Sequence, residues 1–362
     1  MNNRTPVAVI TGFLGSGKTT LLNHVLRDPG FADAVVIINE FGEIALDHLL
    51  VATPDESMVV LGNGCICCEM RGDLVGTLSG LYLRRREGGI PAFGKVLIET
   101  TGLADPVPIL QTLITDREVA PLYRVDSIIT LVDGVHGAAQ LDAGAEALKQ
   151  AALADRLLVS KSDLAPAGAY ERLRARLAGI NPGAEIYPVV RGVVDPARLF
   201  GTGLDDVARG ASLERWLNVE RFRETEGRSD LHRRRGNGRA GTGISAFCIY
   251  YDNPVTAHGL TLWLNLVASL RGANLLRLKG LLNVEGKPVA VHAVQTLIHE
   301  PVTLERWPDA ERRSRLVFIT RGMVRADIER TLPALAFDGS STPGGFDAAA
   351  YARFAAVAGH FR

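Results

Sequence analysis

The sequence predicts an α/β fold in which a mainly parallel sheet is followed by a smaller α+β domain. From residue 6 to about 210, short runs rich in Val and Ile alternate with helical patterns, as helices packed on a parallel sheet require. A glycine-rich motif follows the first of these runs, and further polar motifs follow later ones. Ligands of such sheets gather at the carboxyl ends of the strands, so the motifs agree with the predicted topology.

Seven apolar runs are the predicted strands of the first domain. Each is short, rich in β-branched residues and separated from the next by a polar or helical segment. They span residues 7–10, 34–38, 58–61, 96–98, 127–132, 156–159 and 185–189.

The composition changes after residue 210, where glycines and arginines replace the apolar runs. We predict a flexible basic linker over 211–243. Its cluster of Arg233, Arg234 and Arg235 has no interleaved aromatic residues, which favours a solvated connector over a nucleic-acid surface.

A second α+β domain is predicted over 244–338, after a first domain over 1–210. Its expected strands are 246–251, 275–284, 289–298 and 315–320, and its expected helices are 257–271 and 325–336. Glycines and a proline then break the chain before an alanine-rich stretch, so 339–362 is predicted to be a loop and a helical tail.

Charge and hydropathy exclude some partners. The 362 residues contain 40 Lys and Arg against 40 Asp and Glu, so bulk charge indicates neither a nucleic acid nor an anionic membrane as a partner. No apolar run reaches the length of a membrane span, and the glycine-rich motif interrupts the first one. We therefore expect a cytoplasmic protein without a signal peptide.

The glycine-rich motif GFLGSGKT at 12–19 is a complete phosphate-binding loop. Backbone N–H groups of such a loop surround the β-phosphate, Lys18 reaches the β- and γ-phosphate oxygens, and the Thr19 hydroxyl is placed to hold Mg²⁺. A dinucleotide fingerprint is disfavoured because Thr20 stands where its third glycine belongs. The motif predicts a P-loop NTPase domain whose nucleotide-binding residues are Gly12, Gly15, Ser16, Gly17, Lys18, Thr19 and Thr20.

A second motif, ETTG, follows the strand 96–98. Phosphate-loop hydrolases place a carboxylate and a glycine here, to hold Mg²⁺ through water and to sense the γ-phosphate. We predict that Glu99 and Gly102 act with Lys18 and Thr19 in catalysis. The alternative is an exposed acidic turn, which the phosphate loop upstream disfavours.

The motif SKSD at 160–163 resembles the guanine-reading Asn-Lys-x-Asp motif of GTPases. The Asp163 carboxylate can accept from guanine N1–H and the 2-amino group, which adenine does not offer, and Lys161 can pack along the base. Ser160 replaces the usual Asn and is interpreted as removing one polar contact to the base. A plain Lys-x-Asp can also cap a helix, but with the phosphate loop the motif predicts GTP and GDP as ligands.

Three cysteines, Cys65, Cys67 and Cys68, crowd together on a predicted loop after the strand 58–61. They lie too close together for a disulfide framework, whereas three thiolates suit Zn²⁺ or Cu(I) and leave room for ligand exchange. Buried, inert cysteines are the alternative, which the flanking glycines and the adjacent Glu69 disfavour. Cys248 stands alone on an alternating strand and is predicted to be a core residue.

Other candidate metal ligands are sparse. Glu40 follows the second predicted strand and is predicted to join the thiolates or to contact Mg²⁺, with an exposed loop acid as the alternative. Asp47 is a weaker candidate of the same kind. His292 and His299 fall on a predicted strand of the second domain, where structural histidines are more frequent than ligands.

Together these motifs resemble the CobW-like metallochaperone GTPases. The matching stretches keep the family's order and spacing: 12–19, 39–42 (NEFG), 64–68 (GCICC), 99–106 (ETTGLADP) and 160–163, with 276–283 and 312–319 in the second domain. The resemblance implies a protein that hydrolyses GTP, carries a metal ion, most often zinc, at the cysteine motif, and delivers it to a client metalloprotein. Many relatives have a histidine-rich tract near the linker, where this chain offers only His232.

Two other functions stay open. An ATP-dependent small-molecule kinase would use the same phosphate loop with purely structural cysteines, and Asp163 speaks against it. A metal-storage or scaffold protein with vestigial nucleotide binding is disfavoured by the intact Lys18 and Thr19. Spacing alone nominates no Gln or Arg to orient the attacking water.

Overall fold

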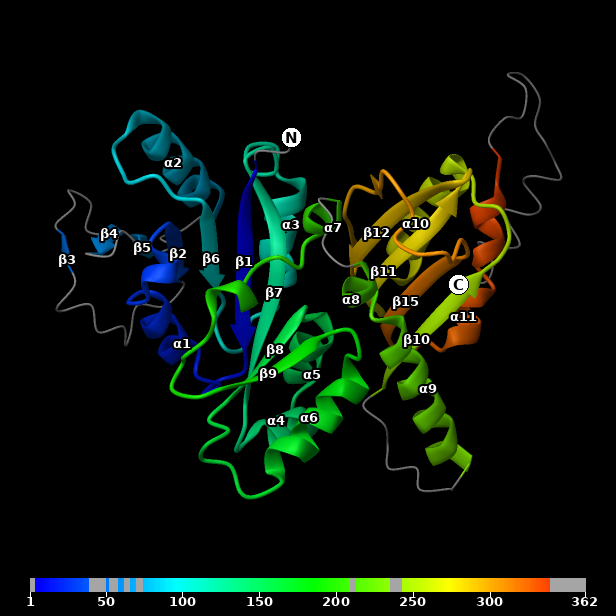
Figure 1. Ribbon diagram of the computed structural model, residues 1–362, viewed down its shortest axis with the longest axis horizontal. Coiled ribbons are helices and arrows are strands. Elements are labelled where there is room, and N and C mark those ends of the chain that lie inside the picture. Colours follow the sequence, from blue (N-terminus) through cyan, green and yellow to red (C-terminus); the bar gives the residue numbers. More distant parts are fainter. Residues whose placement is uncertain are drawn as a thin grey trace. The chain divides into compact units, whose positions relative to one another are not determined.

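A computed structural model of the protein describes residues 4–38, 50–51, 58–61, 66–69, 74–208, 213–234 and 243–338. The chain forms two compact units (Figure 1). The first comprises Met1–Ala178 and Ala184–Gly203, and the second comprises Gly179–Gly183 and Leu204–Arg362. Among the helices of these described ranges, none combines the length and apolar character that a bilayer-spanning segment needs.

The first unit is built on a nine-stranded sheet in the order β3-β4-β5-β2-β6-β1-β7-β8-β9. The strands from β5 to β9 in this order are parallel, whereas β3 and β4 pair antiparallel at one edge. The predicted mainly parallel sheet is confirmed. The strands are β1 (Thr5–Gly12), β2 (Ala34–Ile38), β3 (Leu50–Val51), β4 (Met58–Leu61), β5 (Ile66–Glu69), β6 (Lys95–Glu99), β7 (Tyr123–Asp133), β8 (Arg156–Ser160) and β9 (Glu185–Val189).

The central strands are buried on both faces, which explains their continuous apolar runs. Val7 to Ile10 of β1 and all of β2 are fully or almost fully buried. Figure 1 shows β1 at the centre of this sheet between β6 and β7. The connecting helices are α1 (Lys18–Val25), η1 (Pro29–Phe31), α2 (Leu74–Glu87), α3 (Val107–Thr115), α4 (Gly137–Ala143), α5 (Ala145–Leu153), α6 (Ala169–Ile180) and η2 (Pro196–Arg198).

Two strands of this sheet, β3 and β5, were not predicted. The cysteine motif was assigned to a loop, which is wrong for Ile66–Glu69, because these residues form β5 between β2 and β4. A free thiol behaves as a small apolar group, so Ile66, Cys67 and Cys68 form a short apolar run that pairs with the buried β2.

The second unit is an α+β fold around an antiparallel sheet in the order β10-β15-β11-β12-β13, with β14 paired to β12. On one face, the fully buried Trp263 of α10 packs edge-on against Phe318, with ring centroids 6.4 Å apart. Its elements are α7 (Leu204–Ala208), α8 (Leu213–Leu217), α9 (Val219–Arg234), β10 (Ile244–Tyr251), α10 (Ala257–Arg271), β11 (Leu275–Val284), β12 (Lys287–Val294), β13 (Leu297–Ile298), β14 (Val302–Thr303), β15 (Ser314–Arg321), α11 (Arg325–Glu329) and η3 (Leu332–Ala336).

Two predictions in this half were wrong in detail. The predicted strand 289–298 is divided into β12 and β13 at Gln295, which has a left-handed φ of 52°. The predicted helix 325–336 divides into α11 and η3, because Pro333 lacks the N–H that a continuous helix would need. The predicted helical tail lies in 339–362, outside the described residues.

The predicted flexible linker is also wrong over most of its length. Residues 213–217 and 219–234 form α8 and α9, whereas 211–212 and 235–242 lie outside the described residues. Leu213, Trp216, Leu217 and Phe222 are buried, so an apolar stripe at helical spacing folds this segment onto the unit despite its many arginines.

Two sequence interpretations in the second unit concern titratable side chains. Cys248 is buried as predicted, and burial together with the nearby Glu226 raises the pKa of its thiol to about 12. His292 lies on β12, whereas His299 lies just beyond β13 and not on a strand as predicted, and their rings stack at 4.4 Å. Burial, with His299 and two cationic side chains nearby, lowers the pKa of His292, so its imidazole is neutral at pH 7.

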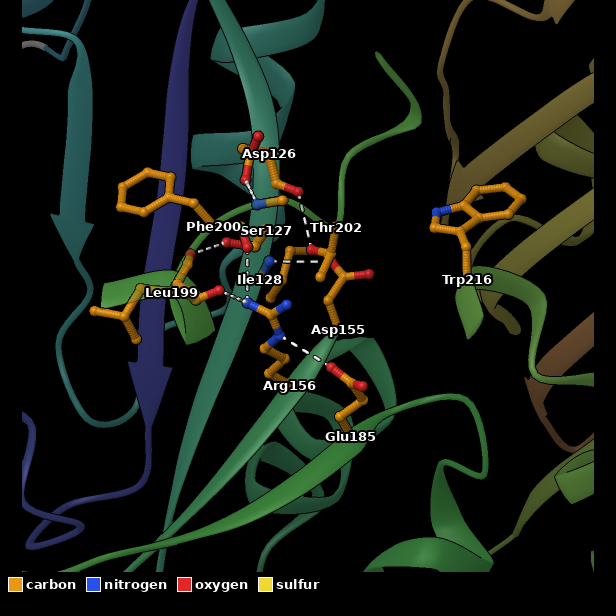
Figure 2. A network of polar contacts seen from close by, with 12 residues as sticks. Asp126, Ser127, Ile128, Asp155, Arg156, Glu185, Leu199, Phe200, Thr202 and Trp216 are labelled. Carbon is orange, nitrogen blue, oxygen red and sulfur yellow. Dashed lines mark hydrogen bonds and ion pairs between the residues drawn. The ribbon is translucent and has the colours of Figure 1, made fainter. Parts of the chain in front are cut away.

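A polar network holds the segment 195–202 at the starting ends of β7 and β8 (Figure 2). The Arg124 guanidinium donates to Asp126 at 2.8 Å, and both side chains are buried. The other carboxylate oxygen of Asp126 accepts from the Gly201 N–H at 2.6 Å. Arg156 donates to the carbonyl of Phe200 at 2.8 Å and to Glu185 at 3.3 Å. The network fixes the chain where it leaves the first unit.

We predict that Asp126→Ala lowers the free energy of unfolding by about 3 kcal/mol, because it removes the carboxylate that pairs with the buried Arg124 guanidinium and accepts from the Gly201 N–H. The matched control is Asp142→Ala, whose carboxylate pairs with Arg176 at 2.6 Å but is 73% exposed, and it should cost less than about 1 kcal/mol. Urea unfolding followed by circular dichroism measures both. Equal losses in the two variants would contradict this account.

Candidate functional site

The phosphate loop runs from the end of β1 into α1, as the sequence predicts. Gly12, Gly15 and Gly17 all have positive φ, of 147°, 75° and 92°. At Gly12 a Cβ atom would lie 2.4 Å from the carbonyl oxygen of Leu131 on β7, so only glycine fits there. The loop therefore has one backbone path, fixed by the neighbouring strand.

This loop has the donor pattern of an anion site. In the described part of the chain, the N–H groups of Leu14, Gly15 and Gly17 donate to no protein acceptor. The buried Ser16 hydroxyl also has no partner there. The α1 helix begins with no acidic residue in its first turn and no side-chain cap. These unused donors, at the positive end of a helix dipole, fit a phosphate group.

Lys18 is the cation of this loop. Its side chain is buried, and its Nζ donates to the carbonyl oxygens of Gly12 at 2.8 Å and Phe13 at 3.5 Å. Thr19 and Thr20 lie in the same first turn of α1. The ammonium group thus lies within the loop that would surround a phosphate.

The turn after β6 lies against the phosphate loop, and Gly102 is the residue of this turn that contacts Leu14. The Thr100 N–H donates to the carbonyl of Ile10, and the Thr100 hydroxyl bonds that of Thr11 at 2.8 Å. A Cβ atom on Gly102 would lie 2.9 Å from the backbone nitrogen of Leu14. Glu99, the last residue of β6, pairs with Ile10 of β1. Gly102 therefore borders the loop, and Glu99 lies beside the strand β1 that leads into it.

The SKSD motif is bonded directly to the phosphate loop. The Ser160 hydroxyl donates to the carbonyl of Ser16 at 2.6 Å, and the Lys161 ammonium donates to the carbonyl of Gly15 at 2.8 Å. Ser160 is buried, and its hydroxyl holds the SKSD segment to the phosphate loop. The sequence interpretation considered only the polar contact to the base that is lost when Ser replaces Asn. Asp163 is exposed just beyond these contacts.

Asp133, which the sequence analysis missed, orients Lys161. Its carboxylate lies 2.7 Å from the Lys161 ammonium and accepts from the N–H groups of Val135 and His136. Burial raises the pKa of Asp133, but these three hydrogen bonds outweigh it and leave the pKa below its ordinary value. The available signal was Val132-Asp133-Gly134, an acid and a glycine at a strand end.

The predicted metal ligands are described only in part. The backbones of Cys67 and Cys68 lie on β5, paired with Val36 and Ile37 of β2, whereas Cys65, Glu40 and Asp47 fall outside the described residues. Among the described side chains, no group of three His, Cys, Asp or Glu is arranged to hold a metal. Three strand-to-strand steps separate β5 from β1, or about 14 Å at the usual spacing.

Two family models match the chain. The CobW/HypB/UreG nucleotide-binding domain matches residues 6–188, and the cobalamin synthesis protein cobW C-terminal domain matches residues 244–336.

Individual proteins and structures are also similar. "Zinc chaperone YjiA" of Escherichia coli K12 is 35% identical over 319 residues, covering 88% of this chain and 94% of the relative. "Zinc chaperone CobW" of Pseudomonas aeruginosa is 28% identical over 363 residues, covering 91% of each. The crystal structure of Zn(II)-bound YjiA GTPase from E. coli matches with a TM-score of 0.69 at 31% identity, covering 93% of this chain and 100% of that one.

Proposed function

The chain belongs to the CobW family, and from this premise we propose that it is a GTP-hydrolysing metallochaperone that carries Zn²⁺ to a client metalloprotein. The observation that carries the nucleotide half of this proposal is the hydrogen bonding of the SKSD motif to the phosphate loop, through Ser160 and Lys161. Because these hydrogen bonds join the two motifs, a base bound at the SKSD motif and phosphates bound at the phosphate loop would be held in a fixed relative position.

Phosphate binding is assigned to the backbone of the loop. The N–H groups that lack a protein acceptor donate to phosphate oxygens, and Gly12, Gly15, Ser16 and Gly17 give the loop the curvature for this. Lys18 is assigned to stabilise the negative charge that develops on the transferred phosphoryl group. Thr20, in the first turn of α1, is assigned to nucleotide binding with the loop. Lys18 therefore contributes chiefly to turnover.

Magnesium fits the acidic side of this site. Thr19 lies in the first turn of α1, and Glu99 ends the adjacent strand β6 with its side chain mostly buried. Mg²⁺, when bound, supplies charge neutralisation on the β- and γ-phosphate oxygens, and Thr19 and Glu99 are the residues that would hold it. Detection of the third phosphate is assigned to Gly102, and its close contact with Leu14 of the loop supports this assignment.

Guanine recognition is assigned to Asp163, with Lys161 beside the base. The Asp163 carboxylate is exposed and makes no hydrogen bond or ion pair with the described residues, so it is available to a ligand. Lys161 has a left-handed φ of 51° and an ammonium anchored to Gly15 and Asp133, which fixes its stem. This arrangement favours GTPase function over the ATP-dependent kinase alternative.

The metal cargo is assigned to Cys65, Cys67 and Cys68, with Glu40 as an additional ligand. Two relatives named zinc chaperones support zinc as the ion, and thiolates suit its coordination chemistry. The cytoplasm keeps thiols reduced and contains GTP, which supports the cytoplasm as the location of this protein. Thiolate zinc sites bind with about 10 to 16 kcal/mol, so release to a client would be slow without a switch.

For the nucleotide, we predict that the protein prefers GTP over ATP by a factor on the order of 10⁴, because a bound base without guanine's donors would cover the Asp163 carboxylate and leave it unpaired and desolvated. Asp163→Asn should lose GTP and gain xanthosine triphosphate, whose 2-carbonyl accepts from the new amide. Competition against a fluorescent GTP analogue, together with phosphate release, measures both. Asp33→Asn, a mostly exposed carboxylate near the start of β2, is the control. Displacement by ATP as effective as by GTP would favour the kinase alternative.

For the metal, we predict that Cys67→Ser weakens zinc binding by at least about tenfold, since the remaining thiolates cannot complete the site. Wild-type affinity should fall as the pH falls, because ligation displaces thiol protons. The matched control is Cys248→Ser, since a buried thiol with a pKa of about 12 is not a ligand. Titration against a chromophoric chelator measures all three proteins. If Cys67→Ser binds zinc as wild type does, the assigned site is wrong.

A further inference from the structure

We infer that Gln150 positions the turn of residues 102–105 so that its backbone can recognise the third phosphate of the nucleotide, an inference that rests on the proposed GTPase function. Gln150 lies on α5 and is 2% exposed. Its Nε2 donates to the carbonyl oxygen of Ala104 at 3.1 Å and approaches that of Gly102 at 3.5 Å. A buried side chain thus reaches the turn that borders the phosphate loop.

The two ends of this turn are held by other groups. Thr100 is bonded to β1 through its N–H and its hydroxyl. At the other end, Asp105 accepts from the Val107 N–H at 3.1 Å and forms an ion pair with Lys149 at 2.6 Å. Between these anchors, the carbonyl groups of Gly102 and Ala104 accept from a side chain, and among the described residues that side chain is Gln150. The middle of the turn therefore depends on it.

The contact between Gln150 and the Gly102 carbonyl also sets the direction of the Leu103 N–H, because both belong to one peptide group. The peptide bonds of the described residues are trans, and in a trans peptide the C=O and N–H point in opposite directions. Because the Gly102 carbonyl faces Gln150, the N–H of Leu103 in the same peptide points away from α5. That N–H has no protein acceptor among the described residues. The contact of Gly102 with Leu14 places it beside the phosphate loop.

Stability alone does not explain a glutamine at this position. Its Oε1 is buried and has no hydrogen-bond partner in the described part of the chain, which is an energetic cost. A methionine has nearly the same length and shape and would bury no unmet acceptor. The helix is already anchored through the main chain, where the Gln150 carbonyl accepts from the Thr130 hydroxyl at 2.8 Å. What the carboxamide adds is its donor to the turn.

The α4 and α5 helices contact both parts of the phosphate site. Gln140 of α4 donates to the carbonyl of Leu14 at 3.3 Å, and a Cβ atom on Gly144 would lie 3.6 Å from the Phe13 ring. The same helix pair thus holds the phosphate loop at one end and the turn at the other. Gln150 therefore sets the turn relative to the loop, and this relation distinguishes a triphosphate from a diphosphate.

The test compares Gln150→Met, which keeps the length and removes the donor, with Gln150→Glu, which sets carboxylate oxygens against the two carbonyls. The control, Thr130→Val, removes the main-chain anchor of the same residue and spares the carboxamide. Fluorescence titrations give the affinities for GDP and for a non-hydrolysable GTP analogue, and phosphate release gives kcat and KM.

We expect Gln150→Met to lower the affinity for the GTP analogue by about tenfold and to leave the affinity for GDP within about twofold of wild type. Gln150→Glu should lower the affinity for the GTP analogue further, again with little effect on GDP. Thr130→Val should leave the ratio of the two affinities at its wild-type value. Equal losses for both nucleotides, unchanged affinities in both Gln150 variants, or the same ratio change in Thr130→Val would overturn the inference. If wild-type protein binds no GTP, the proposed function itself fails, which is a different result.

Discussion

The nucleotide site depends on the backbone carbonyls of one loop, Gly15 and Ser16, which accept from Lys161 and Ser160 of another. These bonds join segments separated by more than 140 positions in the sequence. They hold the SKSD motif at residues 160–163 in register with the phosphate loop. Asp133 completes the arrangement, because its ionised carboxylate holds the Lys161 ammonium in place. The first unit is thus organised around the exit of β1.

The order of strands in the sheet sets the distance between the proposed metal site and the phosphate loop. β5 carries Cys67 and Cys68 in the same parallel sheet as the phosphate loop, about 14 Å away across β2 and β6. That distance is too long for a shared ligand shell and short enough for one moving segment to affect both sites. The turn after β6 lies on this path, since it follows Glu99 and packs against Leu14. We propose that coupling between the two sites passes through this turn, since ordering of a segment by the third phosphate is a known switching device.

The sequence predicted what contiguous motifs determine, including the phosphate loop and the seven strands listed by their Val and Ile runs. It did not find Asp133 or Gln150, because their contacts join residues 28 and 48 positions apart, and spacing carries no such information. The linker prediction failed because it gave more weight to the many arginines of this segment than to a four-residue apolar stripe that begins at Leu213. The strand β5 was missed because the flanking glycines suggested a loop. In each failure, long-range packing decided against local composition.

We propose that the bound nucleotide controls the affinity of the protein for zinc, because a thiolate site releases zinc slowly without a switch. A zinc titration of the same wild-type protein with GDP and with a non-hydrolysable GTP analogue tests this proposal. The account predicts zinc affinities that differ by at least about tenfold, with zinc changing the preference for GTP analogue over GDP by the same factor, because linkage is reciprocal. Identical zinc affinity in the two nucleotide states would contradict it.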